Sequence, residues 1–305
     1  MPIPEPVPQT LANVLTTLQT SGLERLDAQL LLLHVLGQSP KQRGWLLAHD
    51  TDPLPPERAA VLATLAERRL KGEPLAYLTG YKEFFGLDLQ VDARVLVPRP
   101  DTETLVNWAL EVLKPPMTVN AVATAHTATQ SLLDLGTGSG AIALALKANQ
   151  PKLQVHAIDV SPDALTVAQA NARRLQLDVT FNQGAWLASL NDPVLTFDCI
   201  VSNPPYIAAH DPHLSALTHE PLQALASGAD GLDDLRQIIT QAPAHLKPGG
   251  WLLLEHGYDQ AQAVRDLLTS AGFVHAQSRQ DLAGIERCSG GQYQAPQPDI
   301  RRTRP

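Results

Sequence analysis

The chain has 305 residues and a mass of 32.9 kDa, enough for one large domain or for a large domain and a small one. Apolar residues make up 44% of it and charged residues 18%, which excludes disorder over most of its length. The net charge of −8 and the pI near 5.6 argue against a wholly basic surface that grips nucleic acid through its phosphates.

The first residues lack the features of a targeting signal. MPIPEPVPQT has neither a basic nor an apolar stretch, and the apolar run around Leu30–Leu36 is far shorter than the roughly 20 residues that span a bilayer. The two cysteines, Cys199 and Cys288, cannot form a disulfide framework or a four-ligand zinc site. We therefore expect a cytoplasmic protein with no metal centre and no membrane contact.

Three amphipathic helices are predicted in the first 80 or so residues. Apolar residues recur at helical spacing over Leu11–Leu18. Asp27 can cap a second helix, which ends at Gly37. A third begins at Pro55-Pro56-Glu57 and closes at Gly72. These segments predict a small helical bundle.

A linking region follows the predicted bundle. Residues 84–97 alternate apolar and polar side chains and predict a short hairpin. Asp101 or Thr102 can cap a helix that runs through Leu113. Pro115–Gln130 is rich in Ala, Thr and Pro without a period, so we expect a loop inserted before the core of the next domain.

Strands and helices alternate from Ser131 onward. Strands are predicted at Leu132–Leu135, Val155–Ile158, Phe197–Val201 and Trp251–Leu254, with helices at Ala141–Ala148 and after Ser161-Pro162. This alternation predicts an α/β fold, with a mostly parallel sheet between helices. Ligands in such sheets lie beyond the carboxyl ends of the strands.

A glycine-rich turn follows the first of these strands. Glycine at Gly136 and Gly138 allows the backbone to approach a nucleotide that a Cβ atom would exclude. Asp159 lies 23 residues after Gly136, at the end of the second strand, where a carboxylate can accept both hydrogen bonds of a ribose diol. The pattern indicates a nucleotide-binding site.

The turn leaves two classes of nucleotide open. Gly136-x-Gly138-x-x-Ala141 satisfies the dinucleotide fingerprint, which would suit a nicotinamide or flavin enzyme. The longer run Asp134-x-Gly136-x-Gly138-x-Gly140 resembles the first motif of S-adenosylmethionine methyltransferases.

A rigid loop, Asn203-Pro204-Pro205-Tyr206, follows the strand at Phe197–Val201. The Asn203 oxygen and the Pro204 carbonyl can each accept one N–H of a substrate NH₂ group, and Tyr206 can pack against its flat face. The loop therefore suits a planar nitrogen nucleophile.

Asn-Pro-Pro-Tyr in this place is typical of methyltransferases that act on amide or exocyclic amine nitrogens. The whole chain resembles one branch of them, the protein-glutamine N5-methyltransferases of peptide chain release factors (the PrmC/HemK family). The resemblance is carried by Glu73–Gly80, Glu83–Gly86, Val97–Glu103, Asp134–Ala148, Asp159–Leu165, Glu220-Pro221, Asp230–Leu232 and Leu253–Gly257. Asp101 departs from the pattern, where Glu is frequent.

The resemblance implies a Rossmann-like S-adenosylmethionine methyltransferase sheet with a small N-terminal helical domain and a hairpin linker. It implies a substrate glutamine in the Gly-Gly-Gln motif of class-1 release factors, bound by Asn203, Pro204, Pro205 and Tyr206. It also implies that the cofactor is contacted by Gly136, Thr137, Gly138, Ser139, Gly140, Asp159, Trp186 and Asn203.

The resemblance also suggests how the chain is divided. Residues 1–83 would recognise the release factor, 84–110 would form the hairpin and linker, 111–292 the catalytic domain, and 293–305 a tail. We expect release factors as partners, no nucleic acid substrate and a monomer.

Two other functions share these motifs. A DNA adenine-N6 methyltransferase would need a basic recognition region, but residues 1–83 carry eight basic and nine acidic side chains. A binding module without activity is the third hypothesis, and the intact cofactor and amide loops weigh against it.

Gly290-Gly291-Gln292 repeats the tripeptide that the family modifies. We expect a chance occurrence in a turn before a disordered tail. The alternative is that this segment enters an active site as a pseudo-substrate.

Overall fold

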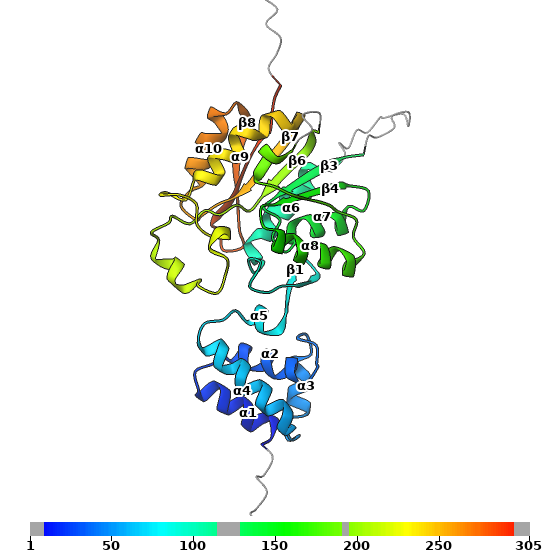
Figure 1. Cartoon of the computed structure of the whole chain (residues 1–305), viewed down its shortest axis with the longest axis vertical. Coiled ribbons are helices and arrows are strands. Elements are labelled where there is room, and N and C mark those ends of the chain that lie inside the picture. The colour runs from blue at the N-terminus through cyan, green and yellow to red at the C-terminus, as the bar shows by residue number, and fades with distance from the viewer. Residues whose placement is uncertain (1–8, 115–128, 191–194, 296–305) are drawn as a thin grey trace, which may run out of the picture. The chain divides into compact units, whose positions relative to one another are not determined.

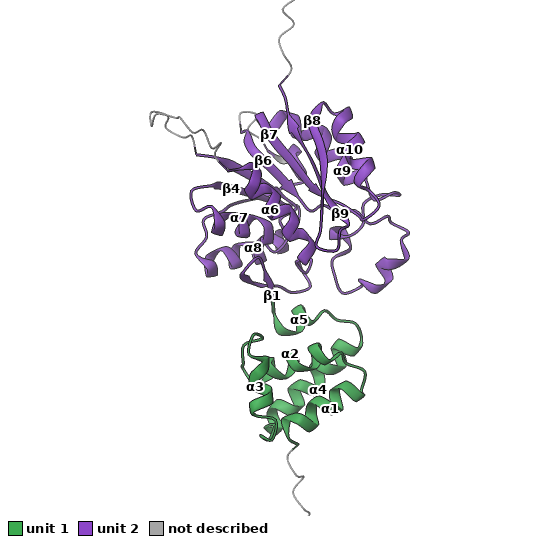
Figure 2. Cartoon of the chain, turned by 180° about the vertical axis from the view of Figure 1, so that it is seen from behind, with its two compact units in different colours: residues 1–81 green, residues 82–305 purple. Residues whose placement is uncertain are grey.

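The computed structural model describes residues 9–114, 129–190 and 195–295 (Figure 1). The chain divides into two compact units, unit 1 at residues 1–81 and unit 2 at residues 82–305 (Figure 2). Each unit has an apolar core of its own, so each is described by itself.

Unit 1 is helical. Its described residues form α1 (Leu11–Thr20), α2 (Arg25–Val35), α3 (Arg43–Ala48), α4 (Pro56–Leu70) and α5 (Leu75–Thr79). The three predicted helices correspond to α1, α2 and α4, and their apolar faces form one core. The short helices α3 and α5 were not predicted, because five or six residues are too few to show a helical period.

The predicted cap of the second helix is wrong. α2 begins at Arg25, and Asp27 lies inside its first turn. The Asp27 carboxylate accepts a hydrogen bond from Arg69 Nε at 2.6 Å, in a half-buried ion pair between α2 and α4. A partner 42 residues away in the sequence therefore replaces the local capping contact.

The hairpin lies earlier than predicted. β1 (Tyr81–Phe84) and β2 (Leu87–Gln90) pair across a turn at Phe85-Gly86, and residues 91–97 form no strand. The following helix is α6 (Glu103–Val112), preceded by a short 3₁₀ turn, η1 (Pro100–Thr102). Thr102 precedes α6, but its side chain does not cap the helix.

The described part of unit 2 contains a seven-stranded sheet with the order β5-β4-β3-β6-β7-β9-β8. Neighbours from β5 to β7 are parallel, and β9 is antiparallel to both β7 and β8. The strands are β3 (Ser131–Leu135), β4 (Gln154–Asp159), β5 (Thr180–Gln183), β6 (Phe197–Ser202), β7 (Leu246–Glu255), β8 (Phe273–Gln280) and β9 (Glu286–Tyr293). The mostly parallel α/β fold is confirmed.

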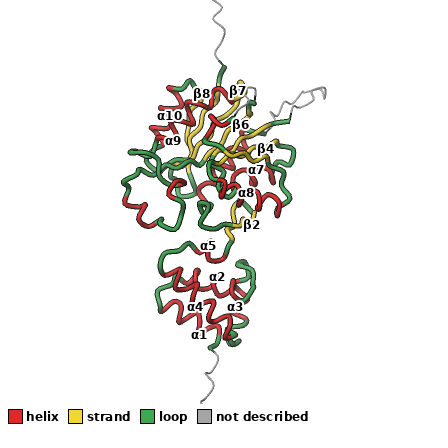
Figure 3. Tube along the Cα trace, viewed as in Figure 1, coloured by secondary structure: helices red, strands yellow, loops and turns green. Residues whose placement is uncertain are grey.

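Helices cover both faces of this sheet, as the separate helix and strand colours of Figure 3 show. α6, α7 and α8 pack on one face, and α9 and α10 on the other. Leu132 enters the first core and Leu133 the second, because successive strand residues point to opposite faces. The remaining elements are α7 (Ala141–Asn149), α8 (Pro162–Leu175), α9 (Asp233–Gln241), α10 (Ala261–Ser270), η2 (Trp186–Ser189), η3 (Pro212–Ala216), η4 (Leu222–Ala224) and η5 (Ala242–His245).

The Gly290-Gly291-Gln292 segment is not a turn. It lies in β9, between β7 and β8, and Gly290 and Gly291 are buried. Gln292 Nε2 donates to the Gly249 carbonyl at 2.8 Å. The turn prediction is therefore wrong, and a segment bonded into the sheet cannot act as a pseudo-substrate without unfolding β9.

Two predicted segments fall mostly on residues that are not described. All but the last two residues of the loop at Pro115–Gln130 lie outside the described part. Residues 296–305 of the expected tail also lie outside it, whereas Tyr293 belongs to β9.

Candidate active site

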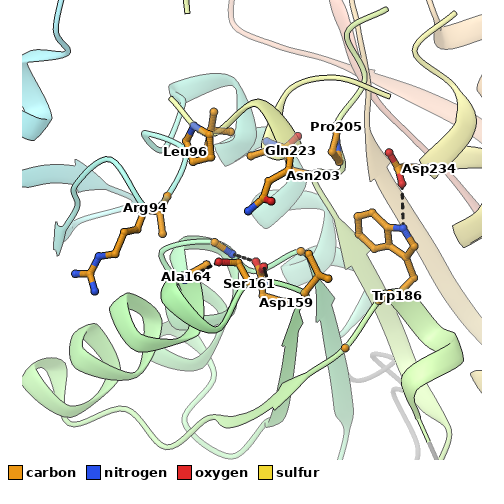
Figure 4. Close-up of a pocket in the computed structure, with 18 residues that line it drawn as sticks. Arg94, Leu96, Asp159, Ser161, Ala164, Trp186, Asn203, Pro205, Gln223 and Asp234 are labelled. Carbon is orange, nitrogen blue, oxygen red and sulfur yellow. Dashed lines mark hydrogen bonds between the residues drawn. The ribbon is translucent and has the colours of Figure 1, made fainter. Parts of the chain in front are cut away.

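A cavity of about 230 Å³ opens at the carboxyl ends of β3, β4 and β6 (Figure 4). Its walls include predicted site residues from the ends of four strands, β3 to β6: Gly136, Gly138, Asp159, Trp186, Asn203 and Pro205. Parallel strands bring their carboxyl ends to one edge of the sheet, which explains why residues far apart in the sequence meet here.

The glycine turn forms the floor of this cavity. Gly136, Gly138 and Gly140 all have left-handed φ angles, between 56° and 84°. Gly138 lines the cavity, and a Cβ atom there would have no protein neighbour within 4 Å. A Cβ on Gly140 would lie 3.0 Å from Leu144 and 3.3 Å from Ala168, so this glycine lets α7 pack against α8.

Asp159 is held at the end of β4 by two backbone amides. Gly138 N–H donates to Oδ2 at 2.8 Å and Ser161 N–H donates to Oδ1 at 2.9 Å. Burial raises the pKa of this carboxyl group above its ordinary value, against the effect of these hydrogen bonds. Each oxygen retains a second acceptor site, so the carboxylate can still bind a diol.

A second acid lies beneath the turn. Asp134 is fully buried, and its Oδ2 accepts hydrogen bonds from Thr137 Oγ1 at 2.7 Å and Ala143 N at 3.2 Å. Its Oδ1 has no partner within the described structure. Burial raises the pKa of Asp134 to about 7. From the sequence, this residue was interpreted only as part of a motif.

Trp186 forms a side wall of the cavity. Its backbone has a left-handed φ of 50°, and its indole Nε1 donates to Asp234 Oδ1 at 3.0 Å (Figure 4). A Cβ on Gly136 would lie 3.2 Å from the indole ring. The indole ring and the glycine turn therefore pack closely. The left-handed backbone of Trp186 costs about 1 kcal/mol of stability.

The Asn203–Tyr206 loop separates two cavities. Asn203 and Pro205 line the larger one, whereas Asn203 and Tyr206 line a neighbouring cavity of about 100 Å³. Asn203 Nδ2 donates to Thr102 Oγ1 at 3.2 Å. Asn203 is thus in contact with both spaces, and Pro204 is buried without lining either.

Four predicted cofactor or substrate residues do not line either cavity: Thr137, Ser139, Gly140 and Pro204. Thr137 donates to Asp134, and the carbonyl of buried Ser139 accepts a hydrogen bond from Asn171 on α8. In this structure these residues shape the turn and the loop.

The comparison with known proteins identifies the family. The family model for the Methyltransferase small domain matches residues 117–278, and that for the PrmC N-terminal domain matches residues 9–80. A release factor glutamine methyltransferase of Bordetella pertussis is 49% identical over 273 residues, covering 88% of this chain and 95% of that protein. One from Burkholderia pseudomallei is 46% identical over 94% of this chain and 97% of that protein.

The chain belongs to the release factor glutamine methyltransferase family.

Solved structures at lower identity support the fold of this family member. A methyltransferase from Pyrococcus furiosus has a TM-score of 0.50 at 19% identity, covering 76% of this chain and 99% of that one. The hMettl16 catalytic domain, solved with an RNA hairpin, has a TM-score of 0.55 at 14% identity, over 78% and 81% of the two chains. Membership of a methyltransferase family favours S-adenosylmethionine over a nicotinamide or flavin cofactor.

No functional motif in the sequence marks the opposite wall of this cavity. Arg94, Val95 and Leu96 line it from the linker, and Pro221, Gln223 and Ala224 line it from the segment after β6. Buried Glu220 joins these two segments: it accepts hydrogen bonds from Val97 N at 3.1 Å and Arg99 Nη2 at 2.5 Å. The sequence signal for this contact is the pair of motifs Val97–Glu103 and Glu220-Pro221. Both carry the family resemblance, but neither indicates by itself that the two segments are in contact.

Gly231 and Gln260 are two further positions that the sequence did not connect with the loop. Gln260 Nε2 donates to the Tyr206 carbonyl at 3.0 Å. A Cβ on Gly231, whose φ is 76°, would lie 2.2 Å from the same carbonyl oxygen. The backbone of Tyr206 is therefore fixed from behind by two residues of unit 2.

The described residues form neither a metal cluster nor a membrane-spanning helix. They contain no group of three or more His, Cys, Asp or Glu side chains placed to hold a metal ion. Within the same ranges, none of the helices has the length and apolar character needed to cross a bilayer.

Proposed function

We propose that this protein transfers a methyl group from S-adenosylmethionine to the side-chain N5 of the glutamine in the Gly-Gly-Gln motif of class-1 release factors. The observation that carries the proposal is the position of Asn203, which lines both cavities at the end of β6. A cofactor in one cavity and an amide in the other would meet beside this side chain. The names of the relatives support the substrate class.

The larger cavity fits S-adenosylmethionine. Gly138 leaves open space at the turn, Asp159 offers acceptors for a ribose diol, and the indole of Trp186 offers a flat apolar wall. The unpartnered Oδ1 of Asp134 is a further buried polar atom beneath the turn. When bound, the cofactor supplies a methyl group on a positively charged sulfur, which is already strongly electrophilic.

The substrate cavity must orient the glutamine amide nitrogen. This nitrogen is a weak nucleophile, because its lone pair is delocalised into the neighbouring carbonyl group. Asn203 Oδ1 would accept one amide N–H group, which fixes the nitrogen and stabilises positive charge that develops on it. The Pro204 carbonyl is the proposed acceptor of the second N–H group, and because Pro204 lines neither cavity here, this contact requires a shift of the loop when the substrate binds. Tyr206 would pack against the amide plane. The proton can leave to water after transfer, so no general base is assigned.

The helical unit 1 is the proposed recognition module for the release factor. This assignment is supported by the match of residues 9–80 to the PrmC N-terminal domain. Proposed domain boundaries for the rest remain 84–110 for the linker, 111–292 for catalysis and 293–305 for the tail. A cytoplasmic location, a monomeric state and the lack of a nucleic acid substrate also stay predictions.

The proposal is tested by offering tritiated S-adenosylmethionine with purified release factor and with duplex DNA in parallel. We expect label in the release factor, on the glutamine of Gly-Gly-Gln, and none in DNA. A release factor in which that glutamine is replaced by alanine is the matched control and should take up no label. Label in DNA adenine, or in a different residue of the release factor, would contradict the proposal.

A further inference from the structure

A buried glutamate connects the two ends of the Asn203–Tyr206 loop. Glu255 is the last residue of β7 and is 1% exposed. Its carboxyl group is hydrogen-bonded to Thr102, and the Tyr206 hydroxyl donates to its Oε1 in a long hydrogen bond of 3.5 Å. Thr102 also accepts the hydrogen bond from Asn203 Nδ2. The carboxyl group thus bonds to the last residue of the loop directly and is linked to the first through Thr102.

The direction of these hydrogen bonds orients the Asn203 amide. A threonine hydroxyl has a single proton, and an ionised carboxylate can only accept. When Glu255 is ionised, Thr102 therefore donates its proton to Glu255. Only the lone pairs of Thr102 then remain for Asn203. Asn203 must present Nδ2 to Thr102, so its Oδ1 is the atom left for the cavities that it lines.

We propose that Glu255 and Thr102 are positioning residues of the methyl-transfer site, which hold the Asn203 amide in the orientation that accepts the substrate N–H. The proposal rests on the function proposed above. Neither residue lines either of the two cavities, so both would act through Asn203 and Tyr206.

The surroundings of Glu255 support a role beyond packing. Its Oε2 has no hydrogen-bond partner among the described residues, which costs free energy in a buried site. Burial and the charge of Asp101 raise the pKa of Glu255 to about 7, while Arg287, Thr102 and Tyr206 act in the opposite direction. Buried carboxyl groups with perturbed pKa values cluster at functional sites.

The test compares three variants of the full chain: Thr102→Val, Thr102→Ser and Glu255→Gln. Valine has the shape of threonine without the hydroxyl, and we expect kcat for release factor methylation to fall about 10- to 100-fold. Glu255→Gln should also lower kcat, and Thr102→Ser should restore most of it. The Kd for S-adenosylmethionine should change less than about twofold in each, because the loss is in orientation.

The double variant Thr102→Val with Glu255→Gln shows whether the two residues act in series. If they do, its kcat should be no lower than that of the more damaged single variant. Ser289→Ala is the matched control, because this buried hydroxyl on the neighbouring strand β9 bonds to His256 and Ser278 instead. It should lower the melting temperature without a change in kcat. A kcat within about twofold of wild type in Thr102→Val would overturn the proposal.

A second readout does not depend on turnover. The side-chain ¹⁵N–H₂ signals of Asn203 should be in slow exchange with water in wild type and in Thr102→Ser, and should shift and exchange faster in Thr102→Val. Unchanged signals in Thr102→Val would overturn the positioning role. If the wild-type protein failed to methylate the release factor, the proposed function would be wrong. The Asn203 signals would still show whether Thr102 orients the Asn203 amide.

Discussion

At the scale of single residues, Asn203 matters most because it lies between the two cavities and has its amide nitrogen already paired with Thr102. Replacing Asn203 by Ala should abolish turnover, at least about 10²-fold in kcat, since an acceptor of the developing charge is lost. S-adenosylmethionine should bind with nearly unchanged Kd in isothermal titration. Single-turnover methylation at the wild-type rate would refute the role given to Asn203.

The buried Asp134 leads to a separate prediction, on how the free energy of unfolding depends on pH. Its pKa is raised from 3.8 to about 7 in the folded protein, so between these values the folded state holds a proton that the unfolded state has released. The free energy of unfolding therefore falls as the pH rises through this window, by on the order of 1–4 kcal/mol.

Asp134→Asn should flatten this pH dependence. The measurement is the melting temperature between pH 5 and pH 8, and the slope is compared rather than the absolute value, because asparagine also alters the hydrogen bonds to Thr137 and Ala143. Glu255 contributes in the same direction, since its pKa is also raised to about 7. A variant with the wild-type slope would show that Asp134 does not titrate in this range.

At the scale of elements, the site depends on contacts between loops that follow different strands. Gly231→Ala would place a Cβ 2.2 Å from the Tyr206 carbonyl oxygen, so the Asn203–Tyr206 loop must move. We expect a loss of about 1–3 kcal/mol in stability and at least about tenfold in kcat.

Gly284→Ala is the matched control for that substitution. Gly284 has a similar left-handed φ of 80°, but a Cβ there would meet nothing within 4 Å. The control should therefore show the cost of the backbone conformation with unchanged kcat. Equal losses of kcat in both variants would mean that the contact with Tyr206 is unimportant.

Glu220 joins two segments that carry the outer wall of the cavity. Glu220→Ala should release Val97 N–H and leave Arg99 without its carboxylate, so the amide of Val97 should exchange with solvent faster. Because Arg94–Leu96 and Pro221 line the cavity, the Kd for S-adenosylmethionine should rise about three- to tenfold. Glu67→Ala, in the exposed pair with Lys71, is the control and should change neither. Unchanged Val97 exchange would contradict this account.

At the scale of the whole molecule, the two units have separate cores, and the proposed cofactor residues all lie in unit 2. Residues 82–305 alone should fold and bind S-adenosylmethionine with wild-type Kd. Methylation of the release factor should fall at least about 10²-fold in kcat/KM, because the proposed recognition unit is missing. Equal kcat/KM for the truncated and full chains would remove that role from unit 1.

The central elements of unit 2 could be predicted because their signals are local. Ser161 caps α8 by accepting a hydrogen bond from Ala164 N, as its position before Pro162 indicated. The glycine turn and Asp159 follow their strands as expected. These features depend on fewer than about ten neighbouring residues, a distance over which propensity and turn chemistry act directly.

The misplaced elements failed for the opposite reason. Aspartate is a common helix cap, but Asp27 lies inside α2 and pairs with Arg69 on α4. The alternation of residues 84–97 satisfied a strand period although only residues up to Gln90 are paired. Gly290-Gly291-Gln292 had the composition of a turn, yet it completes the sheet between β7 and β8.

The sequence by itself determined the α/β class, the glycine turn, the Asn203–Tyr206 loop and the family resemblance, because each depends on short runs of neighbouring residues. Only the tertiary structure decided that Thr102 bonds to Asn203 and Glu255 to Tyr206. It also decided that Glu220 joins the two segments of the far wall and that Gly231 packs against the Tyr206 carbonyl. Some of these contacts join positions more than 100 residues apart. Their geometry depends on which strands become neighbours in the sheet, and no local pattern of side chains encodes that order.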